Sequence, residues 1–332
     1  MKSHIMPGFR KFQCKLFNYT GRSVIFLLVL SFVLSTCNKD DDPVYSAKEL
    51  LIFDLTDDIN ADSIEYLVSW MQNMGTRFSL SDNRRNVAKN IKERFRMIGY
   101  GDVELDSFMI TKTYNNIRYQ QWQYNVIATL EGSVNRDSVS IIGGHYDNIL
   151  MSGDPFATVP GANDNASGVA AALEIARVMK KNSYLPDGTI RFIAFGCEEL
   201  GLFGSYAYAG KARAESEKIK MMLNNDMIAY EPSLDKSAWT VNIIDYENSG
   251  SLRTRAETLC TKYTSLKYTT DNKYNKQSDS YPFFLNGFKP LFFFSDVMDP
   301  SYHSLNDLAS NCNFEYCREI VKLNCAMLLE FN

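Results

Sequence analysis

The most constraining feature of the sequence is an alternation of short apolar runs with longer segments of helical spacing. Several of the runs are continuously apolar, as strands buried on both faces of a sheet are. The runs lie at 103–110, 124–130, 138–144, 189–196, 220–226, 239–244 and 290–296, and the helical segments at 166–181, 203–215, 250–265, 279–286 and 314–330. This alternation predicts an α/β fold, with a sheet covered by helices on both faces.

Two more helices are expected ahead of the first apolar run, within residues 46–100. Ser81 or Asp82 is the expected N-cap of the second helix. The apolar side chains that recur at helical spacing are Leu67, Trp70 and Met71 in one stretch and Val87, Ile91, Phe95 and Ile98 in the next. No linker or second core follows residue 46, so residues 46–332 are expected to form one domain.

The first 36 residues have the composition of an export signal. They contain five basic side chains and no acidic one, with an apolar run from Val24 to Leu34. That run is too short to span a bilayer comfortably and has the length of a signal-peptide core. The rest of the chain carries 30 basic and 39 acidic side chains, a net charge of −9. An acidic body argues against a nucleic-acid partner.

The end of this signal resembles a bacterial lipobox. In Leu34-Ser35-Thr36-Cys37 the cysteine would become the lipidated first residue, although Thr36 stands where Gly or Ala is usual. The following Asn38-Lys39-Asp40-Asp41-Asp42 is similar to a tether that sends some lipoproteins to the cell surface. We expect a signal peptide at 1–36, a lipidated cysteine with an acidic tether at 37–45, and an exported domain at 46–332. A plain secretory signal followed by an acidic linker is the alternative.

Polar motifs follow the predicted strands or open a predicted helix. In open α/β sheets, ligands bind at the carboxyl ends of the strands, so we expect these motifs to converge. The motifs are His145-Tyr146-Asp147, Gly161-Ala162-Asn163-Asp164-Asn165-Ala166-Ser167-Gly168, Glu198-Glu199, Asn224-Asn225-Asp226 and Tyr302-His303-Ser304-Leu305-Asn306-Asp307.

The side chains in these motifs are of the types that bind zinc. Zinc takes imidazole nitrogen and carboxylate oxygen, and a pair of ions also needs a carboxylate that bridges them, for which Asp164 is the natural candidate. Each motif alone has a plain structural interpretation, such as a helix cap for Asp164. The chain has three histidines, however, and the two outside the predicted signal, His145 and His303, both fall in these motifs.

Taken in order, the motifs H-Y-D, G-A-N-D-N-A-S-G, E-E-L-G, N-N-D and Y-H-S-x-x-D resemble those of the co-catalytic zinc aminopeptidases of the bacterial leucyl aminopeptidase type. Glutaminyl cyclases and glutamate carboxypeptidases are relatives of that family. The resemblance covers residues 60–330. It implies a single-domain zinc-exopeptidase-like fold with a mixed, mostly parallel sheet. It also implies an aminopeptidase that hydrolyses N-terminal residues of peptides with a metal-bound water.

The resemblance further implies a role for each site residue. Two zinc ions would be bound, one by His145 and Asp226 and the other by Glu199 and His303, with Asp164 bridging them. Asp147 would accept a hydrogen bond from the second ring nitrogen of His145, Glu198 would be the general base, and Tyr302 would steady the oxyanion. One segment departs from the family pattern: Ser280 replaces the usual His of S-D-H-x-x-F. We expect this replacement to alter the pocket wall and leave the metals alone.

Other functions stay open at this point. A glutaminyl-peptide cyclotransferase would use the same fold with a single zinc ion, but the intact G-A-N-D-N-A-S-G segment favours two ions and hydrolysis. A non-catalytic binding domain would have lost ligands, and none is lost. A carboxypeptidase is disfavoured because the stretch between Asp226 and His303 leaves no room for the domain usually inserted in such relatives.

We therefore expect the substrates to be peptides with a free N-terminus. Aromatic and apolar residues after the motifs are candidates for the wall of a side-chain pocket. These candidates are Met151, Phe156, Tyr281, Phe283 and Phe284. From the signal and the tether, we expect an outer-membrane lipoprotein at the cell surface or in the periplasm of a Gram-negative bacterium, held at the membrane by its lipid alone.

If Cys37 is lipidated, Cys37→Ala should move the folded protein from the membrane fraction to the soluble fraction, because the anchor is then lost. Cell fractionation with an antibody against residues 46–332 measures this. Cys14→Ala is the control, since Cys14 lies inside the predicted signal. Unchanged fractionation of Cys37→Ala would contradict the anchor.

Overall fold

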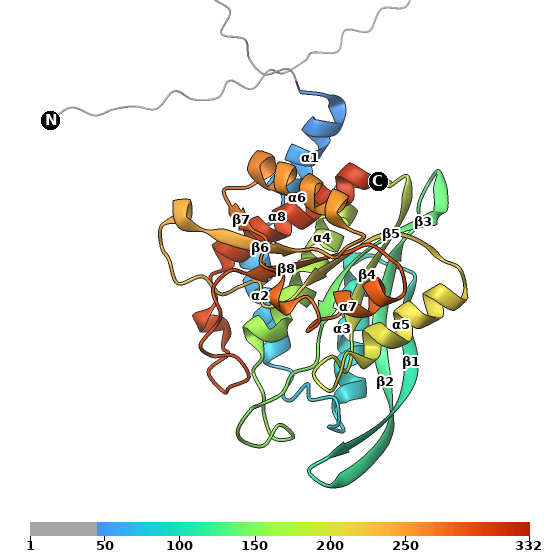
Figure 1. Ribbon diagram of the computed structural model, residues 1–332, viewed down its shortest axis with the longest axis vertical. Coiled ribbons are helices and arrows are strands. Elements are labelled where there is room, and N and C mark those ends of the chain that lie inside the picture. The colour runs from blue at the N-terminus through green and yellow to red at the C-terminus, as the bar shows by residue number, and fades with distance from the viewer. Residues whose placement is uncertain (1–44) are drawn as a thin grey trace, which may run out of the picture. The chain divides into compact units, whose positions relative to one another are not determined.

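A computed structural model describes residues 45–332, so the predicted signal, Cys37 and the tether up to residue 44 lie outside the described residues. The described chain contains one eight-stranded sheet in the order β1-β2-β4-β3-β5-β8-β6-β7 (Figure 1). The strands are β1 (Val103–Tyr114), β2 (Ile117–Leu130), β3 (Asn135–His145), β4 (Gly188–Phe195), β5 (Lys218–Asn225), β6 (Thr240–Ile244), β7 (Lys267–Thr269) and β8 (Pro290–Ser295).

The sheet is mixed, with a parallel centre. Strand β3 pairs in parallel with β4 and β5, and β5 with β8, while β2 is antiparallel to both β1 and β4. Strand β6 runs antiparallel to β8 and parallel to β7. The carboxyl ends of β3, β4, β5 and β8 therefore meet at one edge. This arrangement confirms the predicted α/β fold.

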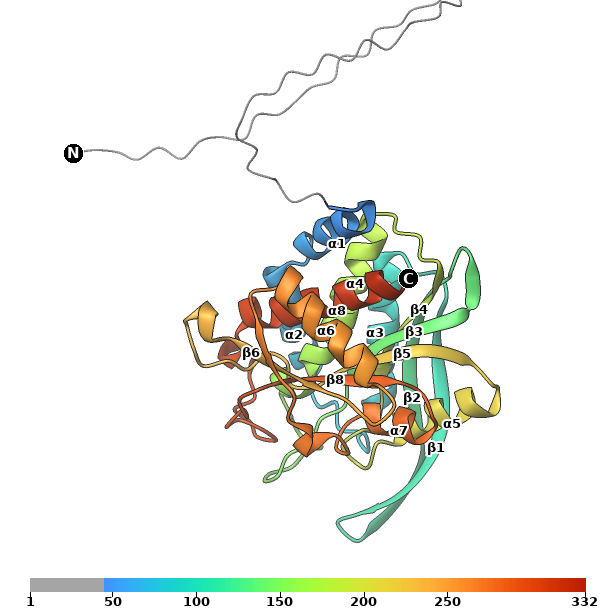
Figure 2. The ribbon, with the colours of Figure 1, turned by 45° about the horizontal axis from the view of Figure 1, so that its top comes forward.

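Helices cover both faces of this sheet (Figure 2). On one face α3, α4, α6 and α8 contact the strands, and α1 and α2 pack on α8 and α4. On the other face α5 and α7 pack together over the strands. The helices are α1 (Ala47–Asp57), α2 (Ala61–Gln72), α3 (Arg84–Ile98), α4 (Ser167–Lys181), α5 (Phe203–Ala214), α6 (Gly250–Tyr263), α7 (Ser280–Leu285) and α8 (Phe314–Phe331).

Burial explains why the central strands are continuously apolar. In β4, Phe192 belongs to the core under α3 and α4, and its neighbour Ile193 belongs to the core under α5 and α7. Successive strand residues point to opposite faces, so a strand covered on both sides must be apolar at every position. The alternation predicted from the sequence is therefore a direct result of the two helical layers.

The structure departs from the prediction in the N-terminal helices and at both ends of the sheet. Residues 46–100 form three helices, and the last begins after Asn83 and not at Ser81 or Asp82. The side-chain amide of Asn83 donates to the carbonyls of Met74 and Thr76 and does not cap the helix. Strands β1 and β2 extend into one long hairpin, and the short strand β7 was not predicted. Within residues 45–332, no helix combines the length and apolar character needed to cross a bilayer.

Candidate metal centre

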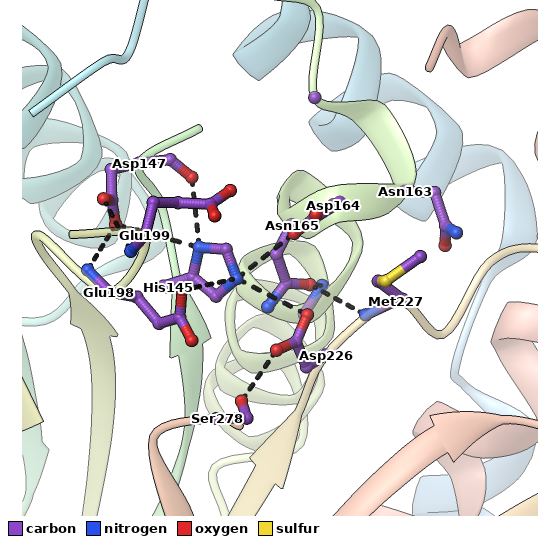
Figure 3. A network of polar contacts seen from close by, with 12 residues as sticks. His145, Asp147, Asn163, Asp164, Asn165, Glu198, Glu199, Asp226, Met227 and Ser278 are labelled. Carbon is purple, nitrogen blue, oxygen red and sulfur yellow. Dashed lines mark hydrogen bonds and ion pairs between the residues drawn. The ribbon is translucent and has the colours of Figure 1, made fainter. Parts of the chain in front are cut away.

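The predicted metal ligands lie together at the carboxyl edge of the sheet. His145 is the last residue of β3, and Asp226 directly follows β5. Glu198 and Glu199 lie in the loop after β4, while His303 lies in the loop after β8. Asp164 lies in an irregular turn, 162–166, that leads into α4. Figure 3 shows Asp164, Glu198 and Asp226 close to His145.

The two histidines approach opposite oxygens of one carboxylate. His145 Nε2 lies 3.3 Å from Asp164 Oδ1 and 3.4 Å from Asp226 Oδ1. His303 Nε2 lies 3.1 Å from Asp164 Oδ2 and 2.9 Å from Glu199 Oε2. Glu198 approaches His145 Nε2 at 4.0 Å. Asp164 therefore lies between two groups of potential metal ligands, each with one imidazole and at least one further carboxylate.

These side chains are arranged better for binding a metal ion than for hydrogen bonding to one another. Three of their atoms, Glu199 Oε1, Asp226 Oδ1 and His303 Nε2, are buried and make no aligned hydrogen bond. Ligand atoms of His145, Asp164 and Glu199 lie within 4.8 Å of one another, as do those of His145, Glu198 and Asp226. Buried polar atoms normally have partners, and nitrogen with carboxylate oxygen is a donor set suited to zinc.

Burial and mutual repulsion shift the acid–base properties of these groups. Burial raises the pKa of Glu198 well above its ordinary range and that of Glu199 to about 8. Burial also favours the neutral form of Asp164, but the adjacent imidazoles of His145 and His303 hold its pKa below the ordinary value. Although burial opposes a charge on His303, Asp164 and Glu199 raise its pKa to about 10. Positive charge is thus favoured at the place where the carboxylates meet.

Asp147 has a different partner from the one predicted. His145 Nδ1 lies 3.0 Å from the backbone carbonyl of Asp147, while the nearer carboxylate oxygen is 3.7 Å away. The carboxylate instead accepts hydrogen bonds from the backbone N–H groups of Glu198 and Glu199, at 3.0 and 3.3 Å, and from the Ser79 hydroxyl at 2.7 Å. Asp147 therefore holds the loop that carries the two glutamates, and its backbone orients His145.

Asp307, in the last motif, holds the turn that carries Asp164. One carboxylate oxygen accepts from the backbone N–H of Asn163 at 2.7 Å, and the other accepts from that of Asp164 at 2.9 Å. At the next turn, Gly168 lies against the backbone of β5, where an added Cβ would come within 2.1 Å of the carbonyl oxygen of Asn225. Asp307 and Gly168 thus help to fix the position of Asp164.

Ser278 orients Asp226 and was not predicted to have a role. Its hydroxyl donates to Asp226 Oδ2 at 2.7 Å and accepts from the Asn224 amide at 2.6 Å. Ser280, which replaces the usual His, is fully buried and accepts a hydrogen bond from the Tyr246 hydroxyl. Ser280 is not among the residues that line the cavity, and the predicted change of the pocket wall stays a prediction.

His303 and Tyr302 are held by their loop. His303 adopts φ +51°, a conformation that is unfavourable for a residue with a Cβ, and its carbonyl accepts from the backbone N–H of Met151 at 2.9 Å. The Tyr302 ring stacks on the His303 ring, with centroids 3.7 Å apart. Burial raises the pKa of Tyr302, so its hydroxyl keeps its proton at neutral pH.

A cavity of about 240 Å³ opens beside the clustered carboxylates. Its apolar wall consists of Met227, Tyr274, Phe292, Phe294 and Met298. The candidates named from the sequence lie elsewhere and do not line it. Phe283 is buried under the sheet against Phe195 and Tyr208, Phe156 packs on Phe78 and Tyr114, and Met151 is 75% exposed.

Known proteins resemble this chain in sequence and in fold. Residues 125–328 match the sequence profile of Peptidase family M28. Leucine aminopeptidase 1 of Trichophyton equinum is 28% identical over 228 residues, which cover 65% of this chain and 60% of that protein. The chain thus spans about 60% of the length of that curated relative.

Solved structures share the fold. The LapA aminopeptidase of Legionella pneumophila has a TM-score of 0.72 at 20% identity, covering 88% of this chain and 77% of that one. A glutaminyl cyclase of Bacteroides thetaiotaomicron has a TM-score of 0.64 at 15% identity, covering 82% of this chain and 98% of that one. At these identities the likeness concerns the fold alone.

Asp147→Asn should lower the free energy of unfolding of the metal-free protein by about 1–3 kcal/mol, because an amide has one acceptor oxygen for three donors. Ser79→Ala removes one of those donors and should cost about 1 kcal/mol. Urea unfolding followed by circular dichroism measures both changes. An Asp147→Asn protein as stable as the wild type would show that the carboxylate does not hold the glutamate loop.

Proposed function

Because the chain belongs to peptidase family M28, we propose that it is a zinc-dependent aminopeptidase that removes single residues from the N-terminus of peptides. One observation carries the proposal. The carboxylate of Asp164 faces His145 with one oxygen and His303 with the other, which is the arrangement that a bridging ligand between two ions requires.

We assign two zinc ions to this site. His145 and Asp226 would hold one ion, Glu199 and His303 the other, and Asp164 would be shared by both. Zinc, when bound, acts as a Lewis acid and lowers the pKa of water. The unpartnered atoms of Glu199, Asp226 and His303 support this assignment, since each ion would receive at least one of them.

Glu198 and Tyr302 are suited to proton handling. Glu198 lines the cavity, and burial raises its pKa, which favours the uptake of a proton that it can then return to the leaving amine. Tyr302 also lines the cavity, and its protonated hydroxyl can donate to an oxyanion. Asp147 contributes by holding the backbone of Glu198 in place.

The cavity also supports a preference for the end and the side chain of the substrate. A free α-amine is positively charged and would be attracted by the surrounding carboxylates. The apolar wall formed by Met227, Phe292, Phe294 and their neighbours fits an apolar N-terminal side chain. The substrates that fit best are therefore peptides with an unblocked, apolar first residue. The proposal also includes export and a lipid anchor at Cys37. This part of it depends on the sequence of residues 1–45.

A glutaminyl-peptide cyclotransferase is the second candidate, because a glutaminyl cyclase shares this fold. Such an enzyme is expected to use one zinc ion. The position of Asp164 between two imidazoles favours two ions and hydrolysis.

The proposed activity predicts that peptides with N-terminal leucine lose that residue, and that their N-acetylated forms are cleaved at less than about a hundredth of the rate, because a blocked amine has no charge for the carboxylates. Amino-acid release measured by chromatography tests this, alongside metal analysis of the purified protein. Equal rates on blocked peptides would refute the aminopeptidase. Cyclisation of N-terminal glutamine without amino-acid release would establish the second candidate.

The adjacent glutamates should respond differently to the same substitution. Glu198→Gln removes proton acceptance and should lower kcat roughly 10²–10⁴-fold while both zinc ions stay bound. Glu199→Gln should weaken the binding of one ion, and added zinc should restore part of the activity. Activity and zinc content are measured on the same samples. The roles would be reversed if Glu198→Gln lost metal while Glu199→Gln kept two ions but did not turn over.

A further inference from the structure

Arg77 is a fully buried cation that makes no ion pair with any residue of the described chain, 45–332. It lies between α2 and α3. Its guanidinium donates to backbone carbonyls on both sides, from Nε to Tyr146 at 2.7 Å, from Nη1 to Pro160 at 2.8 Å and from Nη2 to Gly161 at 2.6 Å. A further bond runs from Nη1 to the carbonyl of Met71 at 3.2 Å.

The three shortest of these bonds reach two loops of the metal centre. Tyr146 is the residue after His145, and Gly161 lies three residues before Asp164. A planar guanidinium presents its donors in a rigid fork, so it fixes the two loops relative to each other. Lysine has a single ammonium on a flexible stem and cannot reproduce that fork.

The charge of Arg77 also faces the metal centre. Burial lowers the pKa of Arg77 to about 10, although the negative charges of Asp307 and Asp147 act to raise it. The guanidinium therefore stays charged at neutral pH. A fixed positive charge behind this group of acids reduces their mutual repulsion. The carboxylates can then remain close together before any ion binds.

The fit around the guanidinium is close. Gly161 adopts φ +55°, and an added Cβ would lie 2.7 Å from Arg77 Nη2. The same Cβ would lie 2.7 Å from the carbonyl oxygen of Asp164 and 2.9 Å from Asn148 Cβ. A side chain at 161 would therefore displace either the guanidinium or the turn of Asp164.

We infer that Arg77 is a positioning residue that sets the separation of His145 and Asp164, and through it the affinity of the site for zinc. This inference rests on the proposed function. It assigns a part in the metal centre to a segment outside residues 125–328, the span that matches the family profile.

The test measures zinc affinity directly, by competition with a chromophoric chelator, on Arg77→Lys and Gly161→Ala. Both variants should raise the zinc dissociation constant at least tenfold. Arg191→Lys is the matched control. Arg191, in β4, pairs with Glu217 away from the carboxyl edge, so its replacement should leave zinc affinity unchanged. Cobalt in place of zinc adds a spectroscopic readout, since its visible bands should shift in Arg77→Lys if the ligand positions change.

A folded Arg77→Lys with wild-type zinc affinity and an unchanged cobalt spectrum would overturn the inference and leave Arg77 a purely structural residue. If Arg77→Lys does not fold, Gly161→Ala decides, because it keeps the guanidinium and crowds both Nη2 and the Asp164 turn beside it. Wild-type affinity in that variant would also overturn the inference. A wild-type protein that binds zinc but releases no amino acids refutes the aminopeptidase alone, whereas one that binds no zinc refutes both.

Discussion

The structure depends on keeping several carboxylates together in a place from which water is largely excluded. Asp147, Asp164, Glu198 and Asp226 are each at most 8% exposed. Isolated buried charges are costly, so each must be neutralised, hydrogen-bonded or paired with a cation. The imidazoles, the backbone N–H groups and the buried guanidinium of Arg77 meet part of that need. Atoms of Glu199, Asp226 and His303 are left without aligned partners, and a bound cation accounts for them better than the protein groups alone.

Backbone hydrogen bonds divide the acids into two groups with different tasks. The carboxylates of Asp147 and Asp307 accept from backbone N–H groups and hold turns, while those of Asp164, Glu199 and Asp226 face the centre of the cluster. A carboxylate that accepts several N–H bonds is bound in one orientation, and it rigidifies the loop that provides them. The site thus combines acids that build the loops with acids that are available for a ligand.

The sequence predicted the sheet and the place where the candidate ligands meet. It did not predict the outer hairpin, the roles of single side chains or the cavity wall. The central strands were found because two helical layers require them to be apolar throughout, and His145, Asp164, Glu199, Asp226 and His303 all lie where strand ends meet. The outer part of the β1–β2 hairpin was missed because its exposed, alternating residues carry little apolar signal. The roles of Asp147 and Ser278, and the cavity wall from β8, depend on side-chain directions between distant segments. One sequence contains no information on those directions.

The short segment from Thr76 to Ser79 bears on where this protein can be cut. Arg77 and Ser79 supply donors to the loops around Asp147, and the Thr76 hydroxyl donates to the carbonyl of Pro155 at 2.5 Å. A fragment that began at residue 125 would leave these acceptors buried without partners and would also remove strand β1 from β2. The smallest unit able to fold on its own is therefore larger than the matched family span, and the N-terminal helices belong to the same cooperative unit as the strands that carry the ligands.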